Sequence, residues 1–498
     1  MKLIDEYIKH IEKEFKKSSL KITEEEIGIV NEVKDGVVLL SGLDSVAYGE
    51  LIQFGKNTVG YVIDLSEDSV GAMVLGDYTG IKAGDQAKAM GITLSVPVSE
   101  GIIGRVVDPL GNPVDGGSKI SEDKRYPVEK IALGVVKRRP VNVPLQTRIK
   151  AIDALIPIGR GQRELIIGDR GTGKTTIALD TILNQKNENV ICIYCAIGQK
   201  NSKIASIVEL FKTQGALNYT IVVNASASDS PALQYLAPYA ACAIGEYFMD
   251  KGMDVLVVYD DLTKHAWAYR QISLILRRPA GREAYPGDIF YLHSRLLERA
   301  CRIDDKYGGG SLTALPIIET LEGDVSAYIP TNVISITDGQ IFLETELFNA
   351  GIRPAINIGL SVSRVGGNAQ TKAMKQVSGK LKLDLAQYRD LVAFSQFESD
   401  LDEETKKLLN RGARMIQILK QRKNQPYSLL DEVAIIWASA NGYLDKIELK
   451  NIEEFEIKLI EDLNARGKKL AEKLNKSRIL DPDIEKELKK FAEDNLLI

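Results

Sequence analysis

The sequence predicts a multi-domain α/β protein with an N-terminal small β-barrel, a central α/β domain on a parallel sheet, and a C-terminal α-helical bundle. Its 498 residues are too many for one hydrophobic core. Short β-rich runs come first, apolar strand-like runs then alternate with helical stretches, and amphipathic helical segments follow. We expect the boundaries to fall at an N-terminal helix over 1–23, the barrel over 24–92, the α/β domain over 93–372 and the helical domain over 373–498.

The first segment, 1–23, has apolar residues close to helical spacing on one face, with mostly Lys and Glu elsewhere. The apolar residues are Leu3, Ile4, Tyr7, Ile8, Ile11 and Phe15. An amphipathic helix at a terminus docks either on its own domain or on a partner. The pattern leaves both open.

Residues 24–92 consist of short apolar runs separated by Gly, Asn and Asp at intervals of roughly ten residues, which is typical of a small barrel or sandwich. The runs include IGIVNEV, GVVLLSG, TVGYVIDL and SVGAMVLG. In the next domain, runs such as NVICIYCAIG and MDVLVVYDD are apolar throughout, which indicates strands buried on both faces of a parallel sheet. After about residue 375, segments such as LLNRGARMIQILKQ predict helices with mixed-charge faces.

Composition excludes several classes of function. The 64 Lys and Arg against 68 Asp and Glu give a formal net charge of -4, which argues against a dedicated nucleic-acid binder. No apolar run approaches the roughly 18–20 residues needed to span a bilayer, and the N-terminus lacks the apolar core of a signal peptide. If the protein works at a membrane, we expect it to reach the membrane only through other subunits. The four cysteines form no disulfide framework.

Residues 168–175 match the P-loop pattern G-x-x-x-x-G-K-[ST], in a strand-to-helix context. Backbone N–H groups of such a loop face phosphates, and the helix N-terminus adds positive potential. The Lys pairs with the β- and γ-phosphates, and the Thr hydroxyl ligates Mg²⁺. The motif predicts ATP or ADP binding by Gly168, Asp169, Arg170, Gly171, Thr172, Gly173, Lys174, Thr175 and the adjoining Thr176.

A second apolar run, VLVVYDD, ends in Asp260 and Asp261. In P-loop proteins such a strand carries an Asp toward Mg²⁺, so we expect Asp260 and Thr175 on the metal side of the site. The alternative is that one of the two carboxylates caps the following helix, and the two roles are compatible if they are divided between the two residues.

Four segments carry a family resemblance. Residues 146–186, 259–300, 323–348 and 351–370, the last being GIRPAINIGLSVSRVGGNAQ, resemble the alpha subunits of F-type ATP synthases. The last stretch is the most specific, and the similarity covers nearly the whole chain. The resemblance implies a regulatory, non-catalytic nucleotide-binding subunit.

The resemblance also implies roles for individual residues. Catalytic beta subunits of the family read Gly-Glu-Arg where this chain has Gly198-Gln199-Lys200, and a Gln amide cannot take a proton from water at neutral pH. Gln199 therefore predicts a site that binds MgATP with negligible turnover. The resemblance implies that Arg364 acts in trans on a neighbouring catalytic site, and that Ser361 also serves activity.

Three further residues match family positions around the nucleotide. Arg170 matches an arginine that supports phosphate binding, and Arg353 and Gln421 match positions near the adenine. Two positions depart from the family, where Gln is common at both: Gly171 in the loop and Lys423 beside the adenine. The departures leave base selectivity open.

The partners implied are beta subunits alternating with this chain in a hexameric ring, a central rotor shaft (gamma) subunit, and a peripheral stalk (delta) subunit met by the N-terminal helix. The resemblance also implies that the complex lies at the cytoplasmic face of the bacterial plasma membrane and transports H⁺ or Na⁺. It implies that the isolated chain is essentially inactive. One alternative is a homohexameric P-loop motor of the secretion or RNA-translocating type, which needs a catalytic Glu where Gln199 stands. A pure assembly protein is disfavoured by Lys174, Thr175 and Asp260.

Overall fold

A computed structural model of the chain describes residues 25–56, 58–395 and 402–496. The described residues fall into two compact units that divide between Leu94 and Ser95. The helix predicted over 1–23 lies outside the described residues, and the predicted boundaries at 92/93 and 372/373 stay predictions.

The N-terminal unit is the closed β-barrel that the sequence predicts. Its six strands are paired in the order β1-β2-β5-β4-β3-β6, and β6 closes the barrel on β1. Alternating residues point inward and form the barrel core, which includes Val30, Val38, Leu40, Ile52, Val62 and Ala72. The strands are β1 (Ile27–Lys34), β2 (Val37–Ser41), β3 (Glu50–Phe54), β4 (Thr58–Leu65), β5 (Val70–Val74) and β6 (Gln86–Thr93).

The second unit is built on a sheet in the order β19-β18-β12-β17-β15-β13-β14-β8, with β16 paired to β17. In this sheet, the pairs from β18 to β8 are parallel, and the described strands β19 and β16 are each added antiparallel. The strands are β8 (Val106–Val107), β12 (Leu165–Asp169), β13 (Val190–Gln199), β14 (Thr220–Ser226), β15 (Asp254–Asp260), β16 (Cys301–Arg302), β17 (Ser311–Thr320), β18 (Gly339–Leu343) and β19 (Val362–Ser363).

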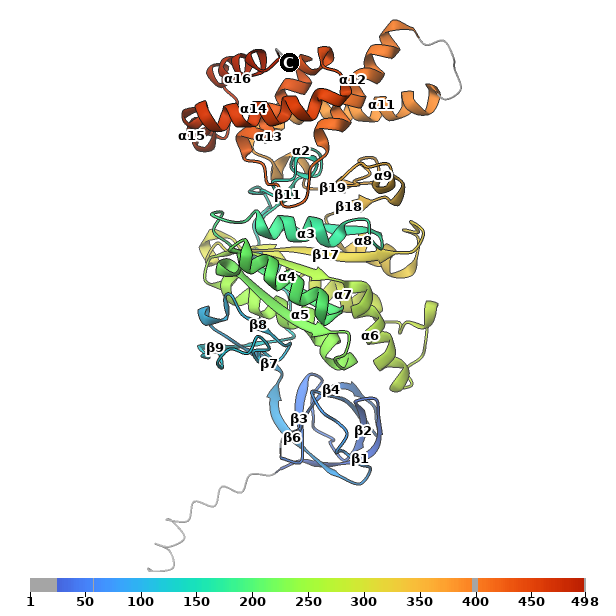
Figure 1. The fold of residues 1–498 in the computed structure, drawn as a ribbon. Helices are drawn as coiled ribbons and strands as arrows, with labels where there is room; N and C mark the ends of the chain where they lie inside the picture. The colour runs from blue at the N-terminus through green and yellow to red at the C-terminus, as the bar shows by residue number, and fades with distance from the viewer. Residues whose placement is uncertain (1–24, 57, 396–401, 497–498) are drawn as a thin grey trace, which may run out of the picture. The chain divides into compact units, whose positions relative to one another are not determined.

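Helices flank this sheet (Figure 1) and bury the strands on both faces. This explains why β13, β15 and β17 are apolar along nearly their whole length. The helices are α2 (Lys150–Leu155), α3 (Lys174–Leu183), α4 (Asn201–Thr213), α5 (Pro231–Asp250), α6 (Leu262–Ile275), α7 (Ile289–Leu297), α8 (Tyr328–Ile336) and α9 (Thr345–Asn349). Two short pairs, β7 (Ser95–Val98) with β9 (Lys124–Pro127) and β10 (Pro144–Leu145) with β11 (Ile158–Gly159), complete the domain.

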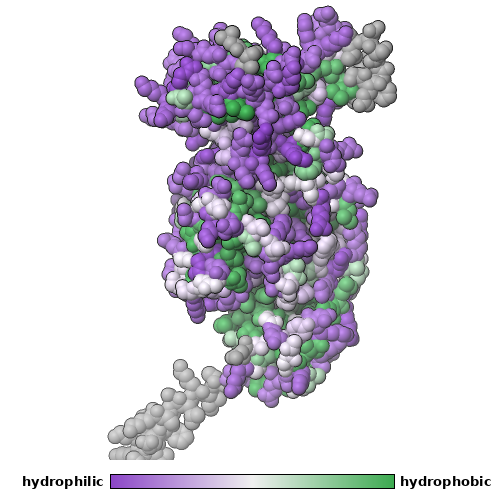
Figure 2. Space-filling model, viewed as in Figure 1, coloured by the Kyte–Doolittle hydropathy of each residue, from purple (hydrophilic) through white to green (hydrophobic). Residues whose placement is uncertain are grey.

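The C-terminal part is helical, as predicted, and Figure 1 shows α11 to α16 gathered into one bundle. Its buried residues continue into the core of the α/β domain through α2 and α10, so the two parts form one compact unit. In the view of Figure 2 the bundle surface is mostly hydrophilic, as the mixed-charge pattern predicts. The helices are α10 (Lys372–Ser378), α11 (Leu381–Ser395), α12 (Glu403–Leu419), α13 (Leu429–Ala440), α14 (Ile452–Arg466), α15 (Lys468–Ser477) and α16 (Pro482–Asp494).

Among the described residues, no helix combines the length and the apolar character that crossing a membrane requires.

Candidate functional site

The P-loop connects the end of β12 to the start of α3. Gly173 immediately precedes α3 with φ 104°, a left-handed conformation that favours glycine. A Cβ on Gly168 would lie 2.4 Å from the carbonyl oxygen of Leu343 on β18, so only glycine fits there. Gly171 is exposed with no other atom near its Cβ position, but its φ of 84° is also left-handed, so the backbone favours glycine at all three positions of the motif.

Lys174 is buried, and its amine donates hydrogen bonds to the carbonyl oxygens of Gly168 and Asp169, each at 2.6 Å. Burial lowers the pKa of this amine, and nearby carboxylates oppose that shift, with Glu319 foremost. Glu319 lies at the end of β17, in register with Gly168. The loop thus holds a cation in place at the N-terminus of α3.

The side chain of Asp169 ties the loop to the neighbouring strands. Its carboxylate accepts hydrogen bonds from Thr320 Oγ1 at 2.7 Å, Gly323 N at 2.8 Å and Thr345 Oγ1 at 3.1 Å. Thr172 closes the loop on itself through a bond from its hydroxyl to the Asp169 carbonyl oxygen at 2.8 Å. These two side chains stabilise the loop backbone, whereas Arg170 and Thr176 are exposed.

Asp260, at the end of β15, is the centre of a buried polar cluster. One carboxylate oxygen, Oδ2, accepts hydrogen bonds from Thr175 Oγ1 at 2.9 Å and from the hydroxyl of Tyr194 at 2.7 Å. The other, Oδ1, accepts one from Gln199 Nε2 at 3.0 Å. The structure therefore brings together Thr175, Gln199 and Asp260, three of the residues that the sequence analysis selects.

Asp261 has a different partner. Its carboxylate caps α6 by accepting a hydrogen bond from Lys264 N at 2.8 Å, and it also forms an ion pair with the Lys264 amine at 2.5 Å. Burial raises the pKa of Asp261, and the Lys264 charge opposes that shift. Asp260 is thus the carboxylate that faces the P-loop.

The oxygen atoms of Thr175 and Asp260 suit Mg²⁺, which prefers hard oxygen ligands and keeps several waters and phosphate oxygens in its shell. Within the described part of the chain, no cluster of three or more His, Cys, Asp or Glu side chains could hold a metal ion. Thr175 and Asp260 fit an ion whose remaining ligands would be phosphate oxygens and waters.

Sequence reasoning missed Lys203, in the first turn of α4. Its amine lies 3.2 Å from Thr175 Oγ1, 3.1 Å from Gln199 Oε1 and 3.6 Å from Asp260 Oδ2. The signal that was available is spacing, because Lys203 follows Gln199 by four residues across the start of a helix.

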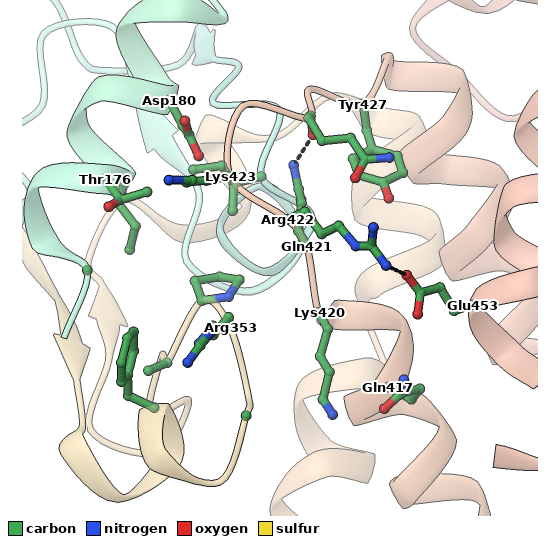
Figure 3. Close-up of a pocket in the computed structure, with 18 of the residues that line it drawn as sticks. Thr176, Asp180, Arg353, Gln417, Lys420, Gln421, Arg422, Lys423, Tyr427 and Glu453 are labelled. Carbon is green, nitrogen blue, oxygen red and sulfur yellow. Dashed lines mark hydrogen bonds and ion pairs between the residues drawn. The ribbon is translucent and has the colours of Figure 1, made fainter. Parts of the chain in front are cut away.

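A pocket of about 610 Å³ extends from the P-loop to the helical domain (Figure 3). Its lining includes Thr172, Gly173, Thr176, Asp180, Phe348, Arg353, Gln417, Lys420, Gln421, Lys423, Tyr427 and Glu453. The volume suits a nucleoside.

Gln421 lines this pocket, but its side-chain amide is engaged within the protein. Its oxygen accepts a bond from Lys150 N at 2.9 Å, and its nitrogen donates to the carbonyl oxygens of Arg148 and Gln425, each at 2.8 Å. This amide, with its acceptor and both donors in use, joins the two domains at the wall of the pocket.

Other polar groups of the pocket are more accessible. Arg353 is exposed and lies over the ring of Phe348, 4.5 Å from its centroid. Lys423 reaches from the loop after α12 toward Asp180 and Thr176 of α3 (Figure 3). Burial raises the pKa of the Asp180 carboxyl to about 6, against the opposing effects of the Asn424 N–H and the Lys423 charge.

Arg364 directly follows β19 and is exposed. Its guanidinium makes no hydrogen bond or ion pair with any residue that the structure describes. Ser361, three residues earlier, is buried. Its hydroxyl donates to the Asn357 carbonyl oxygen at 2.7 Å and accepts from Phe342 N at 2.9 Å, so it anchors the segment that presents Arg364.

Three family models match the chain in sequence order. The beta-barrel domain of the ATP synthase alpha/beta family matches residues 24–91, and the nucleotide-binding domain of that family matches residues 148–363. The C terminal domain of the ATP synthase alpha/beta chain matches residues 370–495.

Proteins named ATP synthase subunit alpha are similar over nearly the full length. Identity is 58% over 480 residues with that of Dehalococcoides mccartyi, covering 96% of this chain and 95% of the relative. It is 59% over 467 residues with that of Petrotoga mobilis, covering 93% of each, and 58% over 465 residues with that of Aquifex aeolicus, covering 93% and 92%. The fold, the P-loop geometry and these relatives together show that the chain belongs to the ATP synthase alpha/beta family and, within it, to the alpha subunits.

Proposed function

We propose that this chain is the non-catalytic subunit of an F-type ATP synthase ring, binding MgATP at its own P-loop and donating Arg364 in trans to a neighbouring beta subunit. The observation that carries the proposal is Gln199. An amide stands where hydrolysis requires a carboxylate, and that amide is bonded to Asp260 at 3.0 Å. It can neither take a proton from water nor turn away from Asp260 without breaking this bond.

The phosphate-binding parts are intact. The Lys174 amine and the N-terminus of α3 supply positive charge to the β- and γ-phosphates. Thr175 and Asp260 would hold Mg²⁺, which neutralises phosphate charge when bound. Tight binding without turnover follows, because charge complementarity is present and a base beside the water is absent from the Gln199 position.

Arg364 supports the trans role because its guanidinium is exposed and makes no hydrogen bond or ion pair with the described residues, although it interacts electrostatically with the buried Glu164. A guanidinium with no hydrogen-bond or ion-pair partner among the described residues is available to a phosphate on another chain. Ser361 positions the segment through its two bonds. A guanidinium delivered to a transferring phosphoryl group stabilises the charge that develops in the transition state.

The arrangement implies hetero-oligomeric partners. We infer alternating beta subunits in a hexameric ring, a central rotor shaft (gamma) subunit and a peripheral stalk (delta) subunit, at the cytoplasmic face of the bacterial plasma membrane. Activity then belongs to the assembled ring, since the donor arginine and the water-activating carboxylate lie on different chains.

The test uses a ring reconstituted with beta and gamma subunits. Arg364→Ala is expected to lower ATP turnover by about 10³-fold or more while leaving MgATP binding to this chain unchanged. Arg125→Ala, which removes an arginine of β9 whose side chain is 50% exposed, is the matched control and should retain activity. Loss of nucleotide binding in Arg364→Ala would show that Arg364 serves its own site.

One observation favours a second candidate, the homohexameric motor. Glu319 is a carboxylate of this same chain close to Lys174, and a self-sufficient ATPase would use it as the base. The proposed function expects negligible turnover by the purified chain. Brisk turnover that Glu319→Gln abolishes would establish the motor instead.

A further inference from the structure

Lys203 places an ammonium group among the three residues that border the proposed metal position. The amine donates to Thr175 Oγ1 and Gln199 Oε1 at 3.2 and 3.1 Å, and it lies 3.6 Å from Asp260 Oδ2. Thr175 itself is 2.9 Å from the same Asp260 oxygen. The ammonium is therefore within reach of both oxygen groups that suit Mg²⁺.

Electrostatics explains why a cation is held there. The Asp260 side chain is only 3% exposed, and a buried carboxylate is costly without a compensating positive charge. Tyr194 and Gln199 supply neutral hydrogen bonds. Among the described residues, Lys203 is the only cation within ion-pair distance of Asp260.

We propose that the Lys203 ammonium group supplies a permanent positive charge at the position where Mg²⁺ would bind. It balances Asp260 when Mg²⁺ is scarce, so that the chain retains nucleotide without the metal, and it competes with Mg²⁺ for Asp260 and Thr175. The inference rests on the proposed function, namely that the P-loop binds a nucleotide. It concerns how much of that binding depends on Mg²⁺.

The chemistry of lysine permits both states. The ammonium has three donors and no acceptor, so it can bond to protein or phosphate oxygens but never ligate a metal. Its four-carbon stem is flexible, and the Lys203 side chain is 40% exposed, so the amine can leave Asp260. If Thr175 and Asp260 held Mg²⁺, the Lys203 amine would have to leave that carboxylate, so we expect Lys203 to weaken the apparent affinity for Mg²⁺ relative to a chain with a neutral side chain here.

The measurable consequence is the ratio of two dissociation constants for ATP, one in EDTA and one in excess MgCl₂. Removing the Lys203 charge should weaken binding in EDTA, because Asp260 then faces the phosphates without a cation within ion-pair distance. The same change should leave binding in MgCl₂ equal or tighter. We expect Lys203→Met to raise the ratio by about tenfold to a hundredfold, the scale of one or two hydrogen bonds from a charged donor.

The experiment is equilibrium binding of labelled ATP to the full, nucleotide-depleted chain in EDTA and in MgCl₂. Lys203→Met removes the charge at nearly constant volume, and Lys203→Arg keeps a charge. Lys200→Met is the matched control, because Lys200 is an exposed lysine just before α4. Thermal unfolding of each variant checks that the fold is retained.

The inference expects an altered ratio in Lys203→Met, a smaller change in Lys203→Arg and none in Lys200→Met. Equal ratios in wild type and Lys203→Met would overturn it while leaving MgATP binding, and so the proposed function, intact. If the wild-type chain binds ATP in neither buffer, the proposed function fails and the inference fails with it. Should Lys203→Met not fold, Lys203→Gln gives the same comparison.

Discussion

The two ends of the nucleotide site are built differently. At the phosphate end, one loop and two strand ends supply groups that are buried and multiply bonded, such as Lys174 and Asp260. At the base end, separate segments of two domains line an open pocket, and Arg353 and Lys423 are exposed. From this difference we infer that most of the binding affinity would come from the phosphate end and that the base end would set selectivity with small energies.

The largest expected effect comes from breaking the phosphate end. Lys174→Met removes the charge that the loop holds at the N-terminus of α3, so binding of MgATP should weaken by about a thousandfold. MgGTP should lose affinity by the same factor, because this end does not contact the base. Isothermal titration of the full chain with both nucleotides measures the two losses.

The control for that variant is Lys186→Met, an exposed lysine just beyond the same helix, which should bind both nucleotides normally. Losses that differ widely between ATP and GTP would mean that the two ends are coupled, so the phosphate end could not be treated as independent of the base.

The contrast also explains what the sequence could predict. The barrel, the parallel sheet and the helical bundle follow from three distinct patterns of apolar residues, and the structure confirms all three parts of the fold. The P-loop residues are contiguous, so a motif identifies them together. The motif also contains Asp169 and Thr172, whose side chains make hydrogen bonds within the protein. The spacing of the motif does not distinguish such residues from those that face a ligand.

The base end could not be predicted in the same way, because its residues meet only through tertiary packing. Asp180, Arg353 and the pair Gln421 and Lys423 come from three segments of the chain. The family resemblance points to Gln421, yet the structure shows its amide engaged with three backbone groups. Lys203 was missed for a related reason, since its partner Asp260 is 57 residues away in sequence.

A smaller effect is expected from Asp180→Asn at the base end. We expect the carboxylate to accept from donors on the base. Guanine presents a ring N–H beside an amino group, whereas adenine presents one amino group. The variant should weaken MgGTP binding by about thirtyfold and MgATP binding by about threefold. The same titrations measure both, with Asp445→Asn as a control distant in sequence. Equal losses for the two nucleotides would remove Asp180 from base recognition.

The smallest expected effect is a pH dependence of stability and of MgATP affinity that arises from Asp180 at the base end. Burial raises the pKa of Asp180 to about 6 from the ordinary 3.8, so the folded chain without nucleotide holds this proton more tightly than the unfolded chain does. The contribution of Asp180 to stability is therefore fully present below about pH 3.8 and is lost as the pH rises through 6.

Nucleotide binding has the opposite sign, because only the ionised carboxylate accepts a hydrogen bond at both oxygens. MgATP affinity should fall by about twofold to threefold between pH 7 and pH 5, with Lys423 limiting the change by favouring the ionised form. Phosphate protonation adds its own pH dependence to every titration, so the quantity to measure is the difference between wild type and Asp180→Asn across that range. Parallel curves for the two proteins would mean that the carboxyl does not contact the base, whereas curves that lie apart at pH 7 and converge below pH 6 would assign the effect to Asp180 itself.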